Sequence, residues 1–214
     1  MVRIFRWNRD KSRDYRETYA EKVKPNEPLK SRIDYAVNQI RNQISKLDSC
    51  SVRLSEKAEK IFIKIVQLLK KKDKQHAAMF ANELAEIKKM NNMVTQSKLA
   101  LEQITLRLET VQNLGDLVIN LNPAINVIKS IKPGLSRVVP EAESEISEIS
   151  NLLGDLLTDV GHVSGWQNNF ETLSEDAEKI LEEASLVAEN RTRERFPDIP
   201  TILPNKSKKI LETA

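Results

Sequence analysis

Apolar residues recur through the first half of the chain at the spacing of a helix that packs against another helix. Between residues 29 and 72 the steps alternate between four and three, which is the heptad pattern of a coiled coil. The seam consists of Ile33, Val37, Ile40, Ile44, Leu47, Ser51, Leu54, Ala58, Ile61, Ile65 and Leu68, of which only Ser51 is out of character. The pattern predicts one helix of about 44 residues, roughly 66 Å long.

A second seam follows a charged interruption at residues 70–75, where a tight turn is expected. The second helix is expected over about 76–114. Its seam consists of Ala77, Phe80, Leu84, Ile87, Met90, Val94, Ser97, Leu101, Ile104, Leu108 and Val111. The step from Ile87 through Met90 to Val94 indicates a small stammer in the register. Because the connection is short, the two helices are expected to form an antiparallel hairpin.

The long uninterrupted helical pattern ends at Gly115, the first glycine of the chain. A short helix is expected around 116–131, starting late or kinked at Pro123. Pro133-Gly134 and Pro140 are typical of hinges or loops.

Two acidic helices are expected after these breaks. The first covers 141–160 and ends near Gly161. The second begins after the N-cap Ser174, runs to about Asn190 and carries Ile180, Leu181, Ala184 and Val187 on one face. Residues 191–214 are proline-rich and are expected to be extended.

These elements predict an all-α protein: a long antiparallel helical hairpin, additional shorter helices and an extended proline-rich C-terminal tail. The expected divisions are a basic N-terminal segment (1–27), the hairpin core with the short third helix (28–135), acidic regulatory helices (136–190) and the tail (191–214).

Composition narrows the class of protein. Five glycines and 5% aromatic residues among 214 disfavour β-sandwiches and α/β enzymes. A single cysteine, Cys50, leaves no disulfide within one chain and fits a reducing cytoplasmic setting. No apolar run approaches the roughly 20 residues of a membrane-spanning helix.

Charge is divided unevenly along the chain. Residues 1–74 carry 20 Lys and Arg against 10 Asp and Glu, whereas residues 141–194 carry 3 against 14. Such polarity predicts either an anionic partner for the basic part or an internal contact between the basic and acidic parts.

The basic residues of the first helix form a stripe at heptad positions c and g, where no acid occurs. The stripe consists of Arg32, Lys46, Arg53, Lys57, Lys60, Lys64, Lys71 and Lys74. It is either a solubilising face or a dock for the chain's own acidic helices, or it is a surface for anionic lipid headgroups or nucleic-acid phosphates. The absence of aromatic residues on the stripe disfavours stacking on single-stranded bases.

Three further segments have alternative interpretations. Large apolar residues and arginines alternate at the N-terminus, which suits a bilayer interface or a disordered or tucked end. The N-terminal residues are Val2, Arg3, Ile4, Phe5, Arg6, Trp7 and Arg9. Four apolar residues of the first helix lie off the seam, so the hairpin alone would not bury them. They are expected to pack against a second partner, either a later helix or another subunit: Phe62, Ile63, Val66 and Leu69. Residues 196–204 alternate apolar residues and prolines, either as an extended ligand for a groove or as a disordered tail.

No catalytic constellation is evident. Asp73/His76 and Asp159/His162 have the i,i+3 spacing of carboxylate–histidine metal ligands, but bridging inward glutamates are not evident on the seams. Neither a glycine-rich phosphate loop nor a nucleophile–base pair is present. A non-enzymatic protein without a cofactor or metal is therefore expected.

Together, the basic N-terminus, the long basic hairpin, the acidic later helices and the proline motif resemble the ESCRT-III family of membrane-remodelling polymers, and within it the shorter archaeal cell-division (CdvB-like) paralogues. The segment from Phe196 to Pro204 is similar to the family's second type of MIT-interacting motif. The resemblance implies that Phe196, Pro197, Ile199, Pro200, Leu203 and Pro204 contact the MIT domain of a CdvC-like AAA+ ATPase.

The resemblance also implies that Arg53, Lys57, Lys60, Lys64 and Lys71 face an anionic membrane together with the N-terminus. It implies filaments formed with itself and with other ESCRT-III-like subunits, in the cytoplasm at the inner face of the membrane, at the division site. The acidic helices would restrain assembly by folding onto the hairpin. Only ten residues follow Pro204, too few for the winged-helix segment of the principal archaeal paralogue, so recruitment through other subunits is expected. A coiled-coil scaffold or a nucleic-acid-binding helical protein is the alternative to these expectations.

Overall fold

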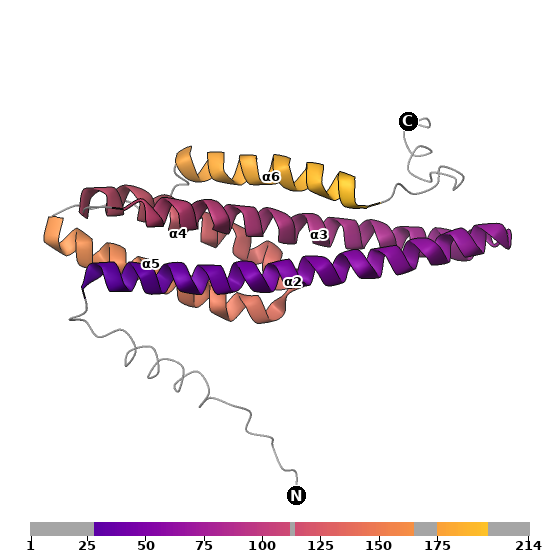
Figure 1. The fold of residues 1–214 in the computed structure, drawn as a ribbon, viewed down its shortest axis with the longest axis horizontal. Coiled ribbons are helices and arrows are strands. Elements are labelled where there is room, and N and C mark those ends of the chain that lie inside the picture. The colour runs from indigo at the N-terminus through magenta and orange to yellow at the C-terminus, as the bar shows by residue number, and fades with distance from the viewer. Residues whose placement is uncertain (1–27, 112–113, 165–174, 197–214) are drawn as a thin grey trace, which may run out of the picture.

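The computed structural model describes residues 28–111, 114–164 and 175–196, and the regular elements in these ranges are all α-helices (Figure 1). The helices are α2 (Leu29–Lys70), α3 (Lys74–Glu109), α4 (Leu114–Val138), α5 (Pro140–Ser164) and α6 (Glu175–Arg195). The predicted all-α fold class is confirmed for these residues. The proline-rich tail after Phe196 and the N-terminal segment lie outside them.

The two longest helices, α2 and α3, form the expected antiparallel hairpin, whose closed end projects beyond the other helices (Figure 1). All eleven seam positions predicted in α2 are buried or half-buried. The prediction for α2 is therefore confirmed to within two residues at its end, while α3 begins two residues earlier and ends five residues earlier than expected.

The turn of the hairpin is a three-residue Schellman motif. The Asp73 and Lys72 N–H groups donate to the carbonyl oxygens of Leu68 and Leu69, each at 3.0 Å. Lys72 is in the left-handed region at φ 61°, which costs a non-glycine residue about 1–2 kcal/mol. The two hydrogen bonds of the turn offset this cost, because they satisfy carbonyl groups that the end of α2 would otherwise leave unpaired.

A buried polar pair divides the hairpin into two apolar cores. The hydroxyl of Ser51 donates to Asn91 Oδ1 at 2.8 Å, and both side chains are almost fully buried. On the side of the chain's other helices, the main core includes Cys50 and Val94. On the side of the turn, the tip core begins at Ala58 and Ile87.

This pair corrects the predicted α3 seam. Asn91, not Met90, occupies the buried position, and Ala81 is more deeply buried than Phe80. The sequence pattern predicted Met90 at this seam position because only apolar residues were used to define the seam. The structure instead places an amide there, where the out-of-character Ser51 satisfies it.

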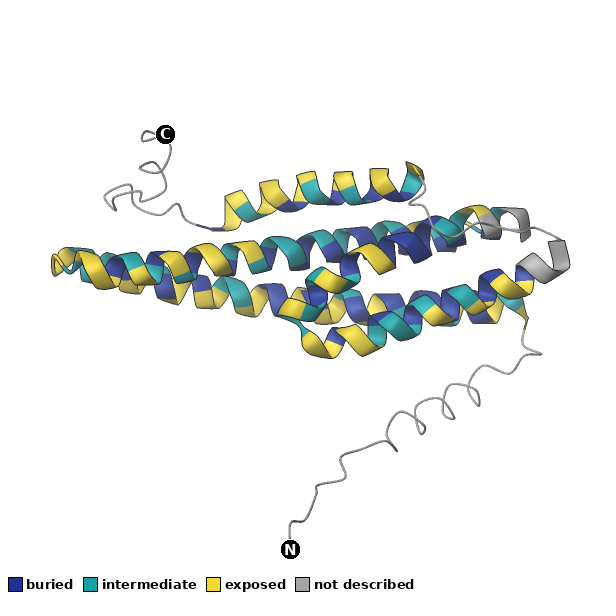
Figure 2. Ribbon diagram, turned by 180° about the vertical axis from the view of Figure 1, so that it is seen from behind, coloured by how far each residue is buried: buried dark blue, intermediate teal, exposed yellow. Residues whose placement is uncertain are grey.

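The shorter helices cover mainly the part of the hairpin that is remote from the turn. Helix α5 packs on α2 and α4, α4 also packs on α3, and α6 lies along α3 and α4 (Figure 1). Burial is greatest where these helices meet, and exposed residues predominate at the hairpin end and on the outer face of α6 (Figure 2).

The loop predicted at Pro133-Gly134 is wrong, because α4 is one helix that contains both Pro123 and Pro133. Each interior proline removes a helix hydrogen bond and costs about 3 kcal/mol. Burial of the apolar face offsets this cost. The buried residues of that face include Leu121, Ile125, Val127, Ile128, Ile131 and Leu135. Pro140, expected in a loop, is instead the first residue of α5, where its missing N–H is harmless.

The acidic helices are longer than predicted. Helix α5 continues past Gly161 to Ser164, and α6 continues five residues past Asn190. The buried face of α6 is formed by Ala177, Ile180, Ala184 and Ala188. Val187, expected on that face, is 41% exposed, so this expectation is wrong. The small alanines, which carry little hydrophobic signal in the sequence, are what allow α6 to lie close to α3.

The Ser51–Asn91 pair is expected to couple energetically. Removing either partner alone leaves the other buried without its hydrogen bond, which costs about 1–3 kcal/mol. A double-mutant cycle of Ser51→Ala and Asn91→Ala, measured by urea unfolding, should therefore give a coupling free energy of about 1 kcal/mol. Ser49→Ala, on an exposed face of α2, is the control. Additive effects within about 0.3 kcal/mol would show that the pair is not an interacting unit.

Candidate functional site

The basic stripe of α2 is divided into a covered half and an open half. In the half remote from the turn, four of the six c and g positions are buried, including Arg32 at 8% exposure and Gln43 at 3%, while Gln39 is half-buried and Lys46 is exposed. Helix α5 packs on this half of α2. For this half of the stripe, the structure therefore supports one of the predicted alternatives, in which the chain's own acidic helix packs on it.

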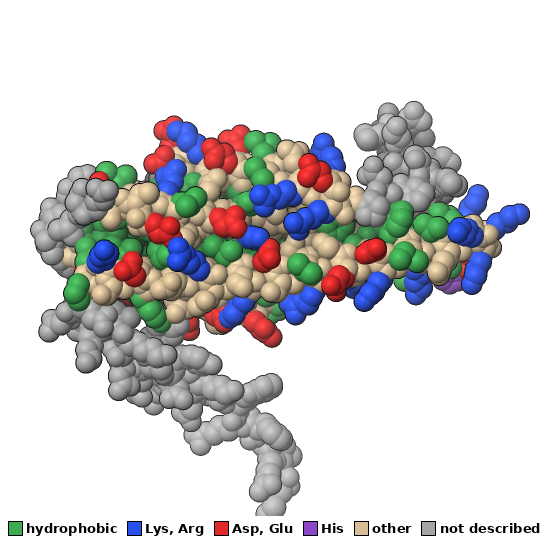
Figure 3. All heavy atoms as spheres, in the orientation of Figure 1, with side chains coloured by type: hydrophobic (Ala, Val, Ile, Leu, Met, Phe, Trp, Pro, Cys, Tyr) green, Lys and Arg blue, Asp and Glu red, His purple; other side chains and the backbone are tan. Residues whose placement is uncertain are grey.

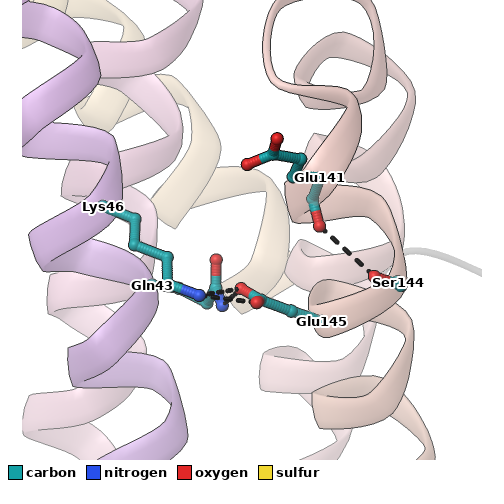
Figure 4. Close-up of polar contacts among 5 residues, drawn as sticks. All are labelled: Gln43, Lys46, Glu141, Ser144 and Glu145. Atoms are coloured by element: carbon teal, nitrogen blue, oxygen red, sulfur yellow. Dashed lines mark hydrogen bonds and ion pairs between the residues drawn. The ribbon is translucent and has the colours of Figure 1, made fainter.

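Three polar side chains of α2 meet carboxylates of α5. Arg32 donates to Asp159 at 2.5 Å, with only 10% of the arginine side chain exposed. Near the other end of the contact, Lys46 lies 2.5 Å and 2.6 Å from the two carboxylate oxygens of Glu145, and Gln43 donates to the same carboxylate (Figure 4). Since Arg32 pairs with Asp159 and Lys46 with Glu145, α5 runs antiparallel to α2.

The charged state of Glu145 is favoured in this contact. Burial raises the pKa of Glu145, but hydrogen bonds from Lys46 and Gln43 and the charge of Lys46 outweigh burial and lower the pKa from 4.5. Glu145 therefore contributes stability above pH 4.5, and this contribution is lost as the pH falls through the lowered folded-state pKa. The glutamate side chain is 35% exposed, so solvent screening keeps the contribution small.

The open half of the stripe lies toward the turn. All five residues predicted to bind membrane in this helix are exposed: Arg53, Lys57, Lys60, Lys64 and Lys71. Lys57 lies 3.1 Å from Glu83 of α3, and the Lys64 ammonium lies 4.0 Å from the centre of the Phe80 ring. Lysines and arginines gather at this end of the molecule (Figure 3). No described helix is long and apolar enough to cross a membrane.

The last described residue, Phe196, is part of the tip core. It is 3% exposed and belongs to the same cluster as Ala58 and Ile61 of α2. Burying a phenylalanine side chain contributes about 1.5–3 kcal/mol. The first residue of the predicted MIT-binding motif therefore holds the end of α6 against the hairpin, which the sequence did not indicate.

The residues predicted to need a second partner lie beside Phe196. Phe62 and Leu69 pack at the edge of the tip core, Val66 is half-buried, and Ile63 is 50% exposed. The end of α6 reaches Phe62, because Phe196 and Phe62 line one groove. A later part of the chain thus covers one end of this set.

Polar contacts hold α6 along α3. Arg107 lies 3.9 Å from Asp176, Gln103 donates to Glu183 at 3.0 Å, and Thr192 donates to Asn92 at 3.3 Å. Within the hairpin, Lys98 bonds to Asp48 and lowers the pKa of that carboxyl. Sequence reasoning missed these pairs because their partners lie 50 to 100 residues apart. The only available signal was the overall charge difference between the two parts of the chain.

The paired Asp73 and His76 serve as a helix cap. Asp73 accepts a hydrogen bond from the His76 backbone N–H at 3.2 Å, and its second oxygen lies 2.8 Å from His76 Nδ1. The backbone hydrogen bond is the largest of the three effects that lower the pKa of Asp73. Among the described residues, no three His, Cys, Asp or Glu side chains gather as metal ligands.

Two predicted sets lie outside the described residues. One is the N-terminal set, Val2, Arg3, Ile4, Phe5, Arg6, Trp7 and Arg9. The other is the rest of the MIT-binding motif, Pro197, Ile199, Pro200, Leu203 and Pro204.

Reversing the charge of Glu145 is expected to loosen α5. Glu145→Lys replaces an attraction with a repulsion at Lys46, so amide protons of α5 should exchange about fivefold faster, equivalent to about 1 kcal/mol. Adding Lys46→Glu should restore slower exchange. The control is Glu143→Lys, the same charge change at an exposed site on the same helix. Equal exchange in both single variants would contradict the role given to Glu145.

Two archaeal proteins are similar in sequence to the chain. The chain is 41% identical to Cell division protein B1 of Sulfolobus acidocaldarius over 177 residues, which is 83% of each chain. It is 27% identical over 162 residues to Cell division protein B of the same organism, covering 76% of this chain and 62% of that protein. No family model and no solved structure matches the chain. On the identity and coverage of the first relative, the chain belongs to the family of the archaeal cell division protein B, the CdvB-like branch of ESCRT-III.

Proposed function

We propose that the chain is a polymer-forming, non-enzymatic subunit that binds and remodels the inner face of the cell membrane during archaeal cell division. The names of the two relatives support the division role. The observation that carries the membrane role is the open half of the basic stripe, which α5 leaves uncovered on a projecting rigid hairpin.

The exposed cations suit a flat anionic surface. Arg53, Lys60 and Lys71 are exposed and make no salt bridge to another described residue. Each lysine or arginine near an anionic membrane contributes about 1 kcal/mol. A rigid helix presents several of them along one line, so their contributions act together on one surface. The N-terminal residues 2–9 would add apolar and arginine contacts at headgroup depth.

The described conformation is the closed state of the subunit in this proposal. Helix α5 occupies Arg32, Gln43 and Lys46 with its own carboxylates. Release of α5 would free these groups and the apolar face beneath them for a neighbouring subunit or for membrane. The contact is electrostatic and partly exposed, so an anionic membrane competes with it directly.

Removal of subunits from the filament would depend on a separate CdvC-like AAA+ ATPase. The MIT domain of this ATPase would bind the proline motif that begins at Phe196. Other ESCRT-III-like subunits would join the same filament. Energy for remodelling would then come from the ATPase, in keeping with a chain that serves as a structural subunit.

Charge reversal on the open half of the stripe is expected to abolish membrane binding. Lys60→Glu, Lys64→Glu and Lys71→Glu together should weaken binding by at least about 100-fold, because each lysine contributes about 1 kcal/mol. Binding is measured by co-sedimentation with liposomes containing 30% or so of phosphatidylserine in phosphatidylcholine. Lys57 is left intact because it pairs with Glu83.

The matched control carries Lys30→Glu, Lys129→Glu and Arg137→Glu, which make the same net charge change at exposed sites away from the hairpin end. Unchanged binding by the stripe variant, or equal loss in the control, would reject the stripe as the membrane surface. Retention on double-stranded DNA with steep salt dependence, without binding to liposomes, would instead indicate a nucleic-acid-binding scaffold.

A further inference from the structure

One side of α5 carries a row of acidic positions along its seam with α2. Six positions three or four residues apart lie on this side of the helix, and they define the α5 row. The row consists of Glu141, Glu145, Glu148, Leu152, Asp155 and Asp159. Glu145 and Asp159 contact α2, and Glu141 lies one turn from Glu145 on the same side (Figure 4). The α5 row therefore follows the edge of α5 that borders α2.

Two acids of the α5 row remain available to a cation. Glu141 and Asp155 are exposed, and neither forms an ion pair with another described residue. Each lies four residues from an acid that contacts α2, and like charges at that spacing on a helix repel each other. Helix α5 contains no lysine or arginine of its own. A cation beside Glu141 or Asp155 would therefore have to come from another segment.

The described chain begins at one end of the α5 row. Arg32 contacts Asp159, and the first described residue, Pro28, precedes Arg32 by only four residues (Figure 1). The 27 residues before Pro28 therefore join the molecule beside Asp159. The sequence Pro25-Asn26-Glu27-Pro28 is typical of a turn. A turn there would send the preceding residues back along α5 toward Glu141.

The segment before this turn has the opposite charge and a matching interval. Residues 1–24 contain eight Lys and Arg against four Asp and Glu. Three of the arginines are six and seven residues apart: Arg3, Arg9 and Arg16. The acids of the α5 row at 141, 148 and 155 are seven residues apart. At the helical rise of about 1.5 Å per residue, residues 3–16 would span about 20 Å and residues 141–155 about 21 Å.

We propose that residues 1–24 dock along the α5 row of the same chain, with Arg3 beside Glu141 and Arg16 beside Asp155. In this alignment residue 24 lies level with residue 163. Because α2 and α5 are antiparallel and Arg32 lies beside Asp159, Leu29 is level with about residue 162. The four residues of the turn then connect two points at the same level of the molecule.

Two other occupants fit the α5 row less well. The tail 197–214 carries only three lysines against two acids, and it follows Phe196, which is buried in the tip core at the far end of the hairpin. The N-terminus of a second copy has the right charge but lacks the short connection. That connection holds the chain's own segment beside the row at an effective concentration on the order of millimolar.

Docking would withhold the N-terminal segment from a membrane, and this part rests on the proposed membrane role. Arg3, Phe5 and Trp7 cannot lie along α5 and at headgroup depth at the same time. An anionic membrane offers the arginines the same sign of charge as the α5 row, so the two surfaces compete. The closed subunit would then touch membrane only through the open half of the stripe.

Disulfide trapping in the full chain tests the docking without any membrane. Ser12→Cys is combined with Asn151→Cys, at an exposed position level with residue 12 in the proposed alignment, and with Cys50→Ala. Under mild oxidation at low protein concentration, this pair should form a disulfide within one chain. Reversing the row with Glu141→Lys and Asp155→Lys should slow its formation about tenfold, because two attractions become repulsions. A lysine near the introduced thiol favours the reactive thiolate, so slower trapping cannot come from thiol reactivity.

A matched control and a charge swap separate docking from a general charge effect. Glu143→Lys with Glu182→Lys makes the same net charge change at exposed sites off the row and should leave trapping unchanged. Adding Arg3→Glu and Arg16→Glu to the row-reversed chain should restore it. Equal rates in the row-reversed and control chains, or no restoration by the swap, would overturn the docking. Disulfides that form only between chains would also overturn it.

Co-sedimentation with liposomes of phosphatidylserine in phosphatidylcholine then tests the withholding. The row-reversed chain should bind about tenfold more tightly than the control chain of equal net charge, because its N-terminal segment is released. Adding Phe5→Ser and Trp7→Ser should remove the gain. Equal binding by the two chains would overturn the withholding. Absence of binding by every variant would refute the proposed membrane role, while the trapping result would still decide whether the segment docks.

Discussion

The contact between acidic α5 and the covered half of the basic stripe is the interaction on which the rest of the structure depends. It pairs Arg32 with Asp159 and Lys46 with Glu145, so it sets both the direction and the position of α5 on α2. Helix α4 is held because it packs between α5 and α3, and α6 is held in turn on α3 and α4. Exposed ion pairs are individually weak. Their value here is to select this arrangement of apolar helices and to make it sensitive to competing anions.

The hairpin is organised so that release of the shorter helices need not unfold its end. The Ser51–Asn91 pair separates the main core, shared with α4, α5 and α6, from the tip core. Among the described residues, Phe196 alone contributes to the tip core from outside the hairpin. The surface on the tip that is proposed to bind membrane would therefore keep its shape whether α5 is bound or released. Phe196, which follows α6 and is buried in the tip core, connects this end of the hairpin to the C-terminal segment.

The sequence predicted the features that repeat and missed those that depend on distant partners. The heptads of α2 specified its seam because each position reports burial in the same way. Asn91 was missed because a buried polar residue looks like an exposed one until Ser51 is seen opposite it. Pro133 was taken for a break because local chemistry disfavours proline in a helix, whereas packing of Ile131 and Leu135 outweighs that cost. For the candidate surface, the charge difference predicted either an anionic partner or an internal contact, and it did not indicate which half of the stripe α5 covers.

Electron microscopy of the full chain and of a chain that ends at Val138, each with and without anionic liposomes, tests the central claim most directly. The account holds that α5 and α6 keep the hairpin closed and that the open half of the stripe binds membrane. It predicts that the full chain is monodisperse in solution, whereas the shortened chain forms filaments and coats or tubulates the liposomes. Particles of the shortened chain that remain monodisperse and ignore the liposomes would contradict it.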